Sequence, residues 1–206
     1  MMNHKHLSSS FSRGFTLIEL IIALLIGAVV TAMSVPMSNM VKSNRTSSVA
    51  YEFASALNYA RSEAITRGNK VTICRTINGV RCGGLPDING QKVWDEGWMV
   101  FSDINGNGQF NPTQDEILSV HGPLPEGYSL RSNARVRVTY KPIGISPGYM
   151  DSWTVCAPDA KPGFARGIIV AYSGRVRFAK DTNDNGTIDN GTLSMQGKPR
   201  ELECRA

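Results

Sequence analysis

The sequence predicts an α+β protein in which a long amino-terminal helix is followed by a β-rich antiparallel globular head. Three observations predict it. A nearly unbroken apolar run occupies residues 15–35, an apolar pattern with helical spacing continues toward residue 67, and short apolar segments separated by turn residues follow from Lys70 onward. The 206 residues are enough for one compact domain and one additional element.

The first element is the apolar run from Phe15 to Val35. As a helix it would be about 31 Å long, which matches one hydrocarbon core, so a membrane-spanning segment is expected over residues 15–35. A cleaved signal peptide fits less well, because the run exceeds an apolar core of about 7–15 residues and no A-x-A site follows it. The run contains one acid, Glu19. An acid at membrane depth costs on the order of 2.5–3.5 kcal/mol and is expected to have a functional partner.

The segment "RGFTLIEL" resembles the class III signal of type IV pilins and of the pseudopilins of type II secretion. The resemblance implies that residues 1–14 are a prepilin leader, that a prepilin peptidase cleaves between Gly14 and Phe15, and that the Phe15 amine is then methylated. Glu19 would pair with the amino-terminal nitrogen of a neighbouring subunit and so favour one assembly register. Pro36 also matches the family, where it kinks the first helix.

The helix is predicted to continue beyond Pro36 as an amphipathic segment. Its apolar side chains recur at spacings of three and four residues: Val49, Phe53, Ala56, Leu57, Ala60 and Ala64. Gly68 suits the position after a last helical turn, so the helix is predicted to end near Arg67. One helix over residues 15–67 would therefore have a lipid half and a half that packs against the head.

The remainder of the chain, residues 68–206, is predicted to form short strands. The segments are "KVTIC", "GWMVFSD", "EILSV", "YSLRS", "RVRVTY", "SWTVCA", "RGIIVAY" and "GRVRFA". Their regular spacing favours antiparallel sheets over βαβ units. The order of helix and strands, with "GWMVFSDINGNG" and a late "SGRVRF", resembles the GspH/FimT group of minor pilins and pseudopilins, which implies a type IV pilin-like fold.

The same resemblance implies a non-catalytic structural subunit of a type IV pilus or a type II secretion pseudopilus, at or near the tip, that supports filament assembly. The implied partners are other pilins or pseudopilins, the prepilin peptidase/N-methyltransferase, an inner-membrane assembly platform and the membrane. The implied location is the bacterial inner membrane, with a single pass and a periplasmic head, and then the filament. No cofactor is expected. The sequence does not distinguish a pilus from a pseudopilus.

Four cysteines lie in the head, which in a protein with this anchor would lie outside the cytoplasm, where disulfides persist. Four cysteines allow three connectivities. Cys74 and Cys82 flank a hairpin-like loop with Asn-Gly at its tip, so they are expected to pair, and Cys156 would then pair with Cys204. A zinc site is the weaker alternative, because no C-x-x-C pair exists and the head has one distant histidine.

Two loops, residues 103–116 and 181–191, share the core D-x-N-x-N-G, which begins a calcium loop. The candidate ligands are Asp103, Asn105 and Asn107 in the first loop and Asp181, Asn183 and Asn185 in the second. The bidentate acid at the twelfth position is missing, because Gln114 and Thr192 stand there. Asx-rich turns without a metal are therefore the favoured interpretation, since Asn and Asp cap their own backbone.

The segment "GISPG", residues 144–148, formally matches the nucleophile elbow G-x-S-x-G of hydrolases. The elbow needs the N–H of the residue after the serine, and Pro147 has none. The sequence therefore predicts no enzyme.

The segment "SGRVRFAK", residues 173–180, is a candidate contact for nucleic acid. In a strand, Arg175 and Arg177 would share one face, and with Lys180 they could hold consecutive phosphates. The net charge of +5 permits an anionic partner without requiring one. Gly174-Arg175-x-Arg177 resembles the motif of FimT-type minor pilins that bind DNA, so the alternative function is the capture of double-stranded DNA during natural transformation.

The other interpretation of this segment is a solvated strand face whose arginines pair with acids such as Asp181. If the segment does bind DNA, further cations could extend the patch: Arg135, Arg137, Lys141, Lys198 and Arg200.

Overall fold

The computed structural model describes residues 15–159, 161–185, 187–193, 199–202 and 204; within these, the side chains of residues 32–38, 162, 190–193 and 199–201 are not described. The chain divides into two compact units, residues 1–40 and residues 41–206. The leader predicted for residues 1–14 lies outside the described residues.

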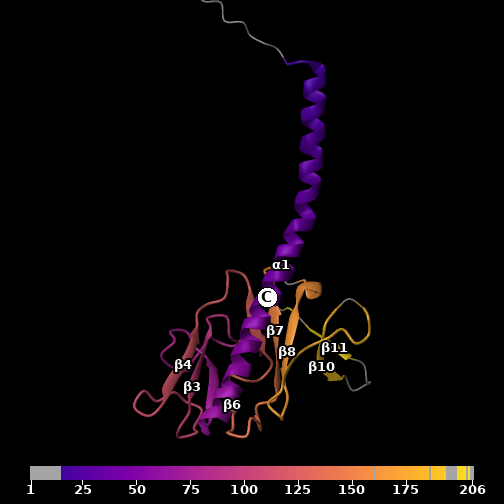
Figure 1. Ribbon diagram of the computed structural model, residues 1–206. Helices are drawn as coiled ribbons and strands as arrows, with labels where there is room; N and C mark the ends of the chain where they lie inside the picture. Colours follow the sequence, from indigo (N-terminus) through magenta and orange to yellow (C-terminus); the bar gives the residue numbers. More distant parts are fainter. Residues whose placement is uncertain (1–14, 160, 186, 194–198, 203, 205–206) are drawn as a thin grey trace, which may run out of the picture. The chain divides into compact units, whose positions relative to one another are not determined.

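The helix α1 runs from Leu17 to Arg67 and continues through Pro36 (Figure 1). Thr16 caps its start, because the Glu19 N–H approaches Thr16 Oγ1 at 3.4 Å. Gly68 follows the last turn with a φ of 66°, the left-handed conformation expected there.

In the first unit, residues 15–31 are all exposed. Their large apolar side chains are Phe15, Leu17, Ile18, Leu20, Ile21, Ile22, Leu24, Leu25, Ile26, Val29 and Val30. The hydroxyl of Thr31 donates within the helix, to the carbonyl oxygens of Gly27 and Ala28, both at 3.0 Å. In the part of the chain that the structure describes, no helix meets the combined length and apolarity of a membrane span.

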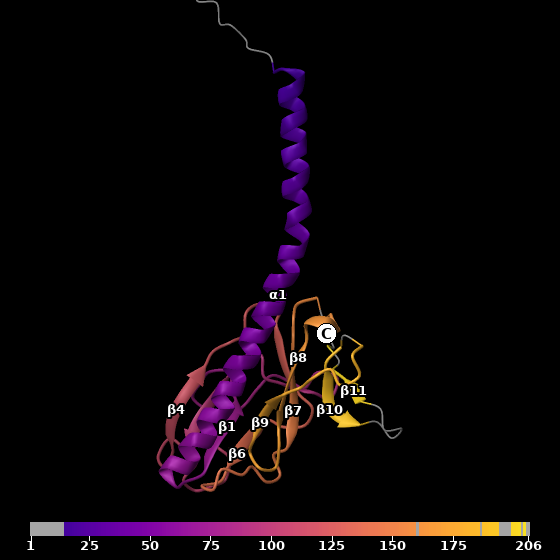
Figure 2. The same ribbon diagram turned by 45° about the vertical axis from the view of Figure 1, so that its right-hand side comes forward.

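The second unit contains two main antiparallel sheets (Figures 1 and 2). The four-stranded sheet has the order β4-β3-β1-β6, with β1 at Val71–Arg75, β3 at Trp98–Ser102, β4 at Glu116–His121 and β6 at Arg137–Tyr140. The five-stranded sheet has the order β2-β5-β7-β8-β9, with β2 at Lys92–Val93, β5 at Ser129–Ser132, β7 at Asp151–Cys156, β8 at Arg166–Val170 and β9 at Val176–Phe178.

Each of the eight strand segments predicted from the sequence forms a strand. The structure adds the short edge strand β2, a 3-10 turn at Pro162–Phe164, and a hairpin of β10, Asp189–Leu193, with β11, Pro199–Glu201. These elements are two to five residues long and carry no alternating apolar pattern, which is why the sequence did not predict them.

The core joins one face of α1 to the inner faces of both sheets. Its helical members are Val49, Ala50, Phe53, Ala54, Leu57, Ala60 and Ala64, all buried, with Ala56 at the margin. The many alanines leave room for the helix to approach the sheets closely. Phe53 lies at the centre, with its ring centroid 5.1–5.5 Å from those of Trp94, Trp98 and Trp153.

The disulfides are Cys74–Cys82 and Cys156–Cys204, the pairing expected from the sequence. The second one joins β7 to the segment after β11. That segment covers the outer face of the five-stranded sheet, since Leu202 is buried against Gly167 of β8 and β10 contacts both β7 and β8. The carboxyl-terminal segment is therefore part of the head's core structure.

Polar contacts attach the helix to the five-stranded sheet near residue 45. Arg166 donates to Ser43 Oγ at 3.0 Å and to Ser47 Oγ at 3.1 Å, and Lys42 Nζ lies 3.0 Å from Asp159 Oδ2. The hydrogen bond and charge of Lys42 lower the pKa of the Asp159 carboxyl below its ordinary value of 3.8.

Replacing Lys42 with Met should lower the melting temperature at neutral pH, because it removes this ion pair. A lowered folded-state pKa stabilises the protein above the ordinary pKa, and the stabilisation is lost as the pH falls through the folded value. The difference from the wild type should therefore shrink as the pH falls through the folded-state pKa of Asp159. Lys180→Met, which removes an exposed cation without an ion pair among the described residues, is the control. A difference that persists unchanged in acid would contradict the assignment.

Candidate functional site

The start of α1 presents Phe15, Thr16 and Glu19 within one turn. Phe15 is 83% exposed, and Gly14, on the other side of the expected cleavage point, lies outside the described residues. Thr16 and Glu19 stand in the arrangement T-x-x-E of a capping box, and Glu19 is the acid in the first helical turn, where the helix dipole favours negative charge.

The sequence interpretation of Glu19 missed its place beside a helix cap, although the T-x-x-E pattern was a readable signal. The Glu19 carboxylate is exposed and forms no hydrogen bond or ion pair with any described residue. A negative charge therefore stands among exposed apolar side chains without a described counter-charge. Such a group can accept a cation from another molecule.

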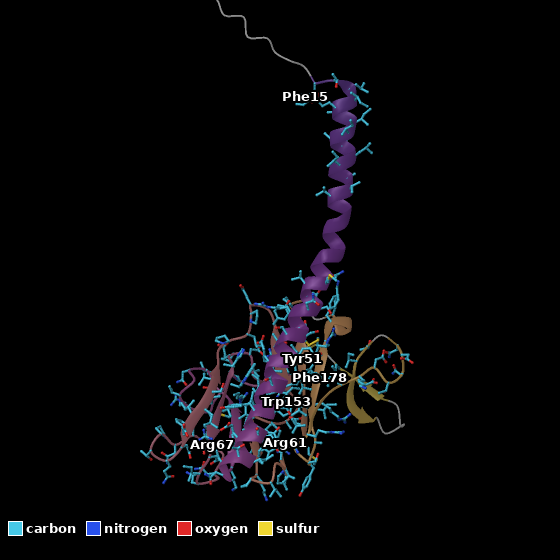
Figure 3. The ribbon with its side chains drawn as sticks, viewed as in Figure 1. Phe15, Tyr51, Arg61, Arg67, Trp153 and Phe178 are labelled. Carbon is cyan, nitrogen blue, oxygen red and sulfur yellow. A yellow bond between two sulfur atoms is a disulfide. The ribbon has the colours of Figure 1, made fainter. Side chains whose placement is uncertain are left out.

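The second candidate site lies on β9, the last strand of the five-stranded sheet. Val176 packs against the core, and the ring of Phe178 lies 4.8 Å from that of Tyr51 on α1 (Figure 3). Because side chains alternate along a strand, Arg177 and Arg175 face the outer side of the sheet, as the sequence predicts. Both arginines are exposed.

Gly174 fixes the turn before these arginines. Its φ is 75°, its N–H donates to the Ala171 carbonyl at 2.9 Å, and the Arg175 carbonyl accepts the Ala171 N–H at 3.0 Å. A Cβ atom at position 174 would lie 2.1 Å from the carbonyl oxygen of Gly144. Glycine is thus required here by both conformation and space.

No acid in the described part of the chain forms an ion pair with Arg175, Arg177 or Lys180. The three cations lie along one segment of nearby residues, so their charge remains available to an anionic partner.

The additional predicted cations come from several parts of the head. Arg137 belongs to the four-stranded sheet and lies against Gly108 and the Cys74–Cys82 disulfide. Arg135 follows the β5 end, where its carbonyl accepts the Trp94 indole N–H at 3.0 Å. Lys141 is exposed after β6. Lys198 and the side chain of Arg200 lie outside the described parts.

The first candidate calcium loop uses its oxygens internally. Asp103 Oδ2 accepts Thr72 Oγ1–H and the Gly108 N–H, both at 2.9 Å, and Asn105 Oδ1 accepts the Asn107 N–H at 3.0 Å. Lys70 Nζ lies 3.3 Å from the Gly106 carbonyl oxygen. This loop is an Asx-rich turn that already has a protein cation beside it.

The second loop has the same nested turns. Asp181 Oδ1 accepts the N–H groups of Asn183 and Asn185 at 3.2 and 3.3 Å, and Asn183 Oδ1 accepts the Asn185 N–H at 3.2 Å. Asp189 is 2% exposed, and its N–H donates to the Lys180 carbonyl at 3.1 Å, which closes this loop. No group of three or more His, Cys, Asp or Glu side chains that could hold a metal gathers among the described residues.

The serine of the hydrolase-like segment is a structural residue. Ser146 is fully buried, its Oγ donates to the Thr139 carbonyl at 3.1 Å, and its N–H donates to the Tyr172 carbonyl at 3.0 Å. His121 instead stacks on Trp98, with ring centroids 3.9 Å apart, and its Nε2 lies 3.1 Å from Glu52 Oε2. The serine and the histidine therefore do not form a catalytic pair.

The family model described as "Type II transport protein GspH" matches residues 49–174, and the model described as "Prokaryotic N-terminal methylation motif" matches residues 10–35. No curated protein matches the chain. A crystal structure of the type IV minor pilin FimU from Pseudomonas aeruginosa aligns with a TM-score of 0.50 and 19% identity over 65% of this chain and 87% of that chain. A second crystal form of FimU aligns with a TM-score of 0.48, 19% identity, and 64% and 90% coverage.

The match to FimU concerns the fold: a long amino-terminal helix followed by antiparallel sheets, which is the type IV pilin-like α+β fold predicted from the sequence. The methylation-motif model covers the segment in which the sequence resemblance was recognised.

Replacing Gly174 with Ala should destabilise the head by more than about 1 kcal/mol, because the new Cβ meets both a left-handed φ and the Gly144 oxygen. The matched control is Gly148→Ala, since Gly148 has a φ of 79° but nothing within 4 Å of its Cβ position. Denaturant unfolding should show a larger loss for position 174. Equal losses would mean that the close approach to Gly144 is not restrictive.

Proposed function

Because this chain belongs to the type II transport protein GspH family, we propose that it is a minor pilin or pseudopilin that acts as a non-catalytic structural subunit of a type IV pilus or type II secretion pseudopilus. The observation that carries the proposal is the exposed Glu19 carboxylate, without a described partner, in the first turn of an apolar helix that matches the methylation motif.

Filament assembly gives that carboxylate a partner. After cleavage between Gly14 and Phe15, the new amine of Phe15 would be a cation at the start of a helix with exposed apolar side chains. When subunits stack, the amine of one chain meets the Glu19 carboxylate of its neighbour, and a charge that is costly in an apolar environment becomes paired. The cost of leaving it unpaired would favour one register of stacking.

The exposed apolar side chains of residues 15–31 support this role. A continuous run of exposed apolar side chains must be shielded from water. A bilayer would shield it before assembly, and neighbouring helices would shield it in the filament. We therefore place the subunit in the inner membrane through residues 15–35, with its head in the periplasm, until an assembly platform transfers it to the filament. Its place at or near the tip follows from its resemblance to minor pilins.

Glu19→Gln should strongly reduce incorporation into sheared filaments, because it removes the charge while keeping the size and the capping ability of the side chain. The control is Thr16→Ala, which weakens the helix cap and keeps the charge. Both variants should still be cleaved, so amino-terminal sequencing should begin at Phe15. Immunoblots of the sheared filament and membrane fractions measure incorporation.

If Glu19→Gln protein enters filaments at the wild-type level, pairing does not drive assembly. If Thr16→Ala is equally defective, the requirement is for the start of the helix and not for the charge.

A second candidate function is DNA capture through β9. The specific observation is that Arg175 and Arg177 are exposed on one face, beside Lys180, with no ion pair to a described acid. Contacts to phosphates from such a patch would be dominated by charge and would weaken steeply with salt. Gly174 contributes by fixing the turn that presents both arginines.

Arg175→Ala/Arg177→Ala should abolish most binding to short duplex DNA, as measured by fluorescence anisotropy. The slope of the logarithm of the binding constant against the logarithm of the salt concentration should become smaller in magnitude by about two. The control is Arg45→Ala/Arg81→Ala, which removes two exposed cations elsewhere on the same unit. If the Arg175→Ala/Arg177→Ala protein binds DNA as well as the wild type does, the hypothesis of DNA capture through β9 is rejected. The structural role in the filament is then the function that stands.

A further inference from the structure

We propose that the end of the head where α1 enters it binds the phosphate groups of anionic phospholipids. The 3-10 turn Pro162–Phe164 lies beside the entering helix (Figures 1 and 2). The basic entry surface, as we call it, consists of four side chains from the helix and from both sides of this turn: Lys42, Arg45, Lys161 and Arg166. The inference rests on the proposed membrane residence of the subunit and names the membrane component that its head contacts.

Contacts within the head bring these four cations together. Lys42 Nζ and Lys161 Nζ lie 3.0 and 3.8 Å from the same oxygen atom, Asp159 Oδ2. Arg166 contacts the same stretch of α1, because it donates to two serine hydroxyls there at 3.0 and 3.1 Å. Arg45 follows Lys42 by three residues, a spacing that makes two side chains neighbours on the surface of a helix.

The basic entry surface carries more positive charge than the head neutralises. Among the described residues, Asp159 is the one acid that pairs with these cations, and Lys42 and Lys161 share it. The Lys161 side chain is still 63% exposed. Arg45 is exposed, and neither it nor Arg166 forms an ion pair with a described acid. Four cations and one acid give a formal charge of +3, which attracts an anion from another molecule.

The next acid along α1 does not change this balance. Glu52 is seven residues beyond Arg45, which in a helix is a rise of about 10 Å. Its carboxylate is already engaged, since Oε1 accepts the Ser48 hydroxyl at 2.9 Å and Oε2 lies 3.1 Å from His121 Nε2. At physiological salt, charges separated by more than about 8 Å are largely screened from one another.

Chain connectivity keeps the basic entry surface close to the membrane. If residues 15–35 span the bilayer, Lys42 is seven residues beyond the end of the spanning segment. In a helix, which α1 forms over this stretch, seven residues rise about 10 Å. The headgroup layer extends about 5–7 Å beyond the hydrocarbon core. The long side chains of Lys42 and Arg45 can therefore reach headgroup phosphates.

The chemistry of this surface suits a membrane interface better than a dissolved anion. Val41, next to Lys42, is 63% exposed. An interface accommodates both kinds of side chain, because apolar groups and the stems of Lys and Arg lie among the lipids while the charges meet phosphates. The guanidinium of Arg45 can also bind two phosphate oxygens at once. A dissolved phosphate would leave Val41 in water.

The test uses the full chain in nanodiscs of phosphatidylcholine, either alone or with about one-third phosphatidylglycerol. Hydrogen exchange is measured by mass spectrometry in the peptide of residues 161–166. At about 0.15 M NaCl, exchange should be about threefold slower or more in the anionic discs, and at about 0.5 M NaCl the difference should disappear.

Arg45→Gln/Lys161→Gln should lose most of this difference, because it removes the two exposed cations of the basic entry surface. The matched control is Arg81→Gln/Lys141→Gln, which also removes one exposed arginine and one exposed lysine of the head and should keep the difference. The two disc compositions are compared within each variant. Unchanged exchange in the core strands establishes that each variant folds. If the first variant does not fold, Lys161→Gln replaces it and should lose about half of the difference.

Equal exchange of the wild-type chain in neutral and anionic discs would overturn the proposal and leave these cations to a neighbouring subunit. A slowing that both variants retain would reflect only the potential of the lipid surface and would overturn it as well. The same slowing by inorganic phosphate on the chain in detergent micelles would assign the surface to a dissolved anion and not to lipid. A chain that enters neither kind of disc would instead contradict the membrane residence on which this inference rests.

Discussion

The structure of the head depends on the burial of one helical face around Phe53. Its phenyl ring meets the indoles of Trp94, Trp98 and Trp153, which come from segments up to one hundred residues away. Burying one aromatic side chain contributes about 1.5–3 kcal/mol. That burial is possible only when both sheets are in place, because each sheet supplies part of the surface. The helix, the two sheets and their connecting loops are therefore mutually dependent, and the polar contacts of Arg166 add orientation to a core that is already closed.

The sequence predicted the elements whose signal is periodic. The helix face and all eight strand segments were recognised, because apolar spacing survives in a single sequence. It did not predict β2, β10 or β11, which are short and carry no alternating apolar pattern. Nor could it show that Asp189 is buried and accepts the Thr182 N–H, because this contact depends on how the chain folds and not on a pattern of residue types. The sequence also did not show that Arg137 and Arg175 belong to different sheets, since strands of similar composition cannot be assigned to one sheet or the other by residue type alone.

At the candidate sites, local and intermolecular roles coincide in the same residues. Glu19 stands where a helix cap and its dipole favour a carboxylate, so the acid is locally tolerated before any partner arrives. Gly174 is required by the turn, and the same turn presents Arg175. A motif can therefore persist for structural reasons and be available for binding, which explains why the residues alone indicated two interpretations of "GRVR".

The position of the three tryptophans has a spectroscopic consequence. They are all the tryptophans of the chain, and each of them contacts Phe53 on α1. All indole emission from this protein therefore comes from side chains whose rings pack against a residue of the helix. Intrinsic fluorescence should consequently report the docking of the helix on the sheets directly, without an introduced dye, and the detachment of the helix from a still-folded pair of sheets would be visible as a red shift of the whole spectrum.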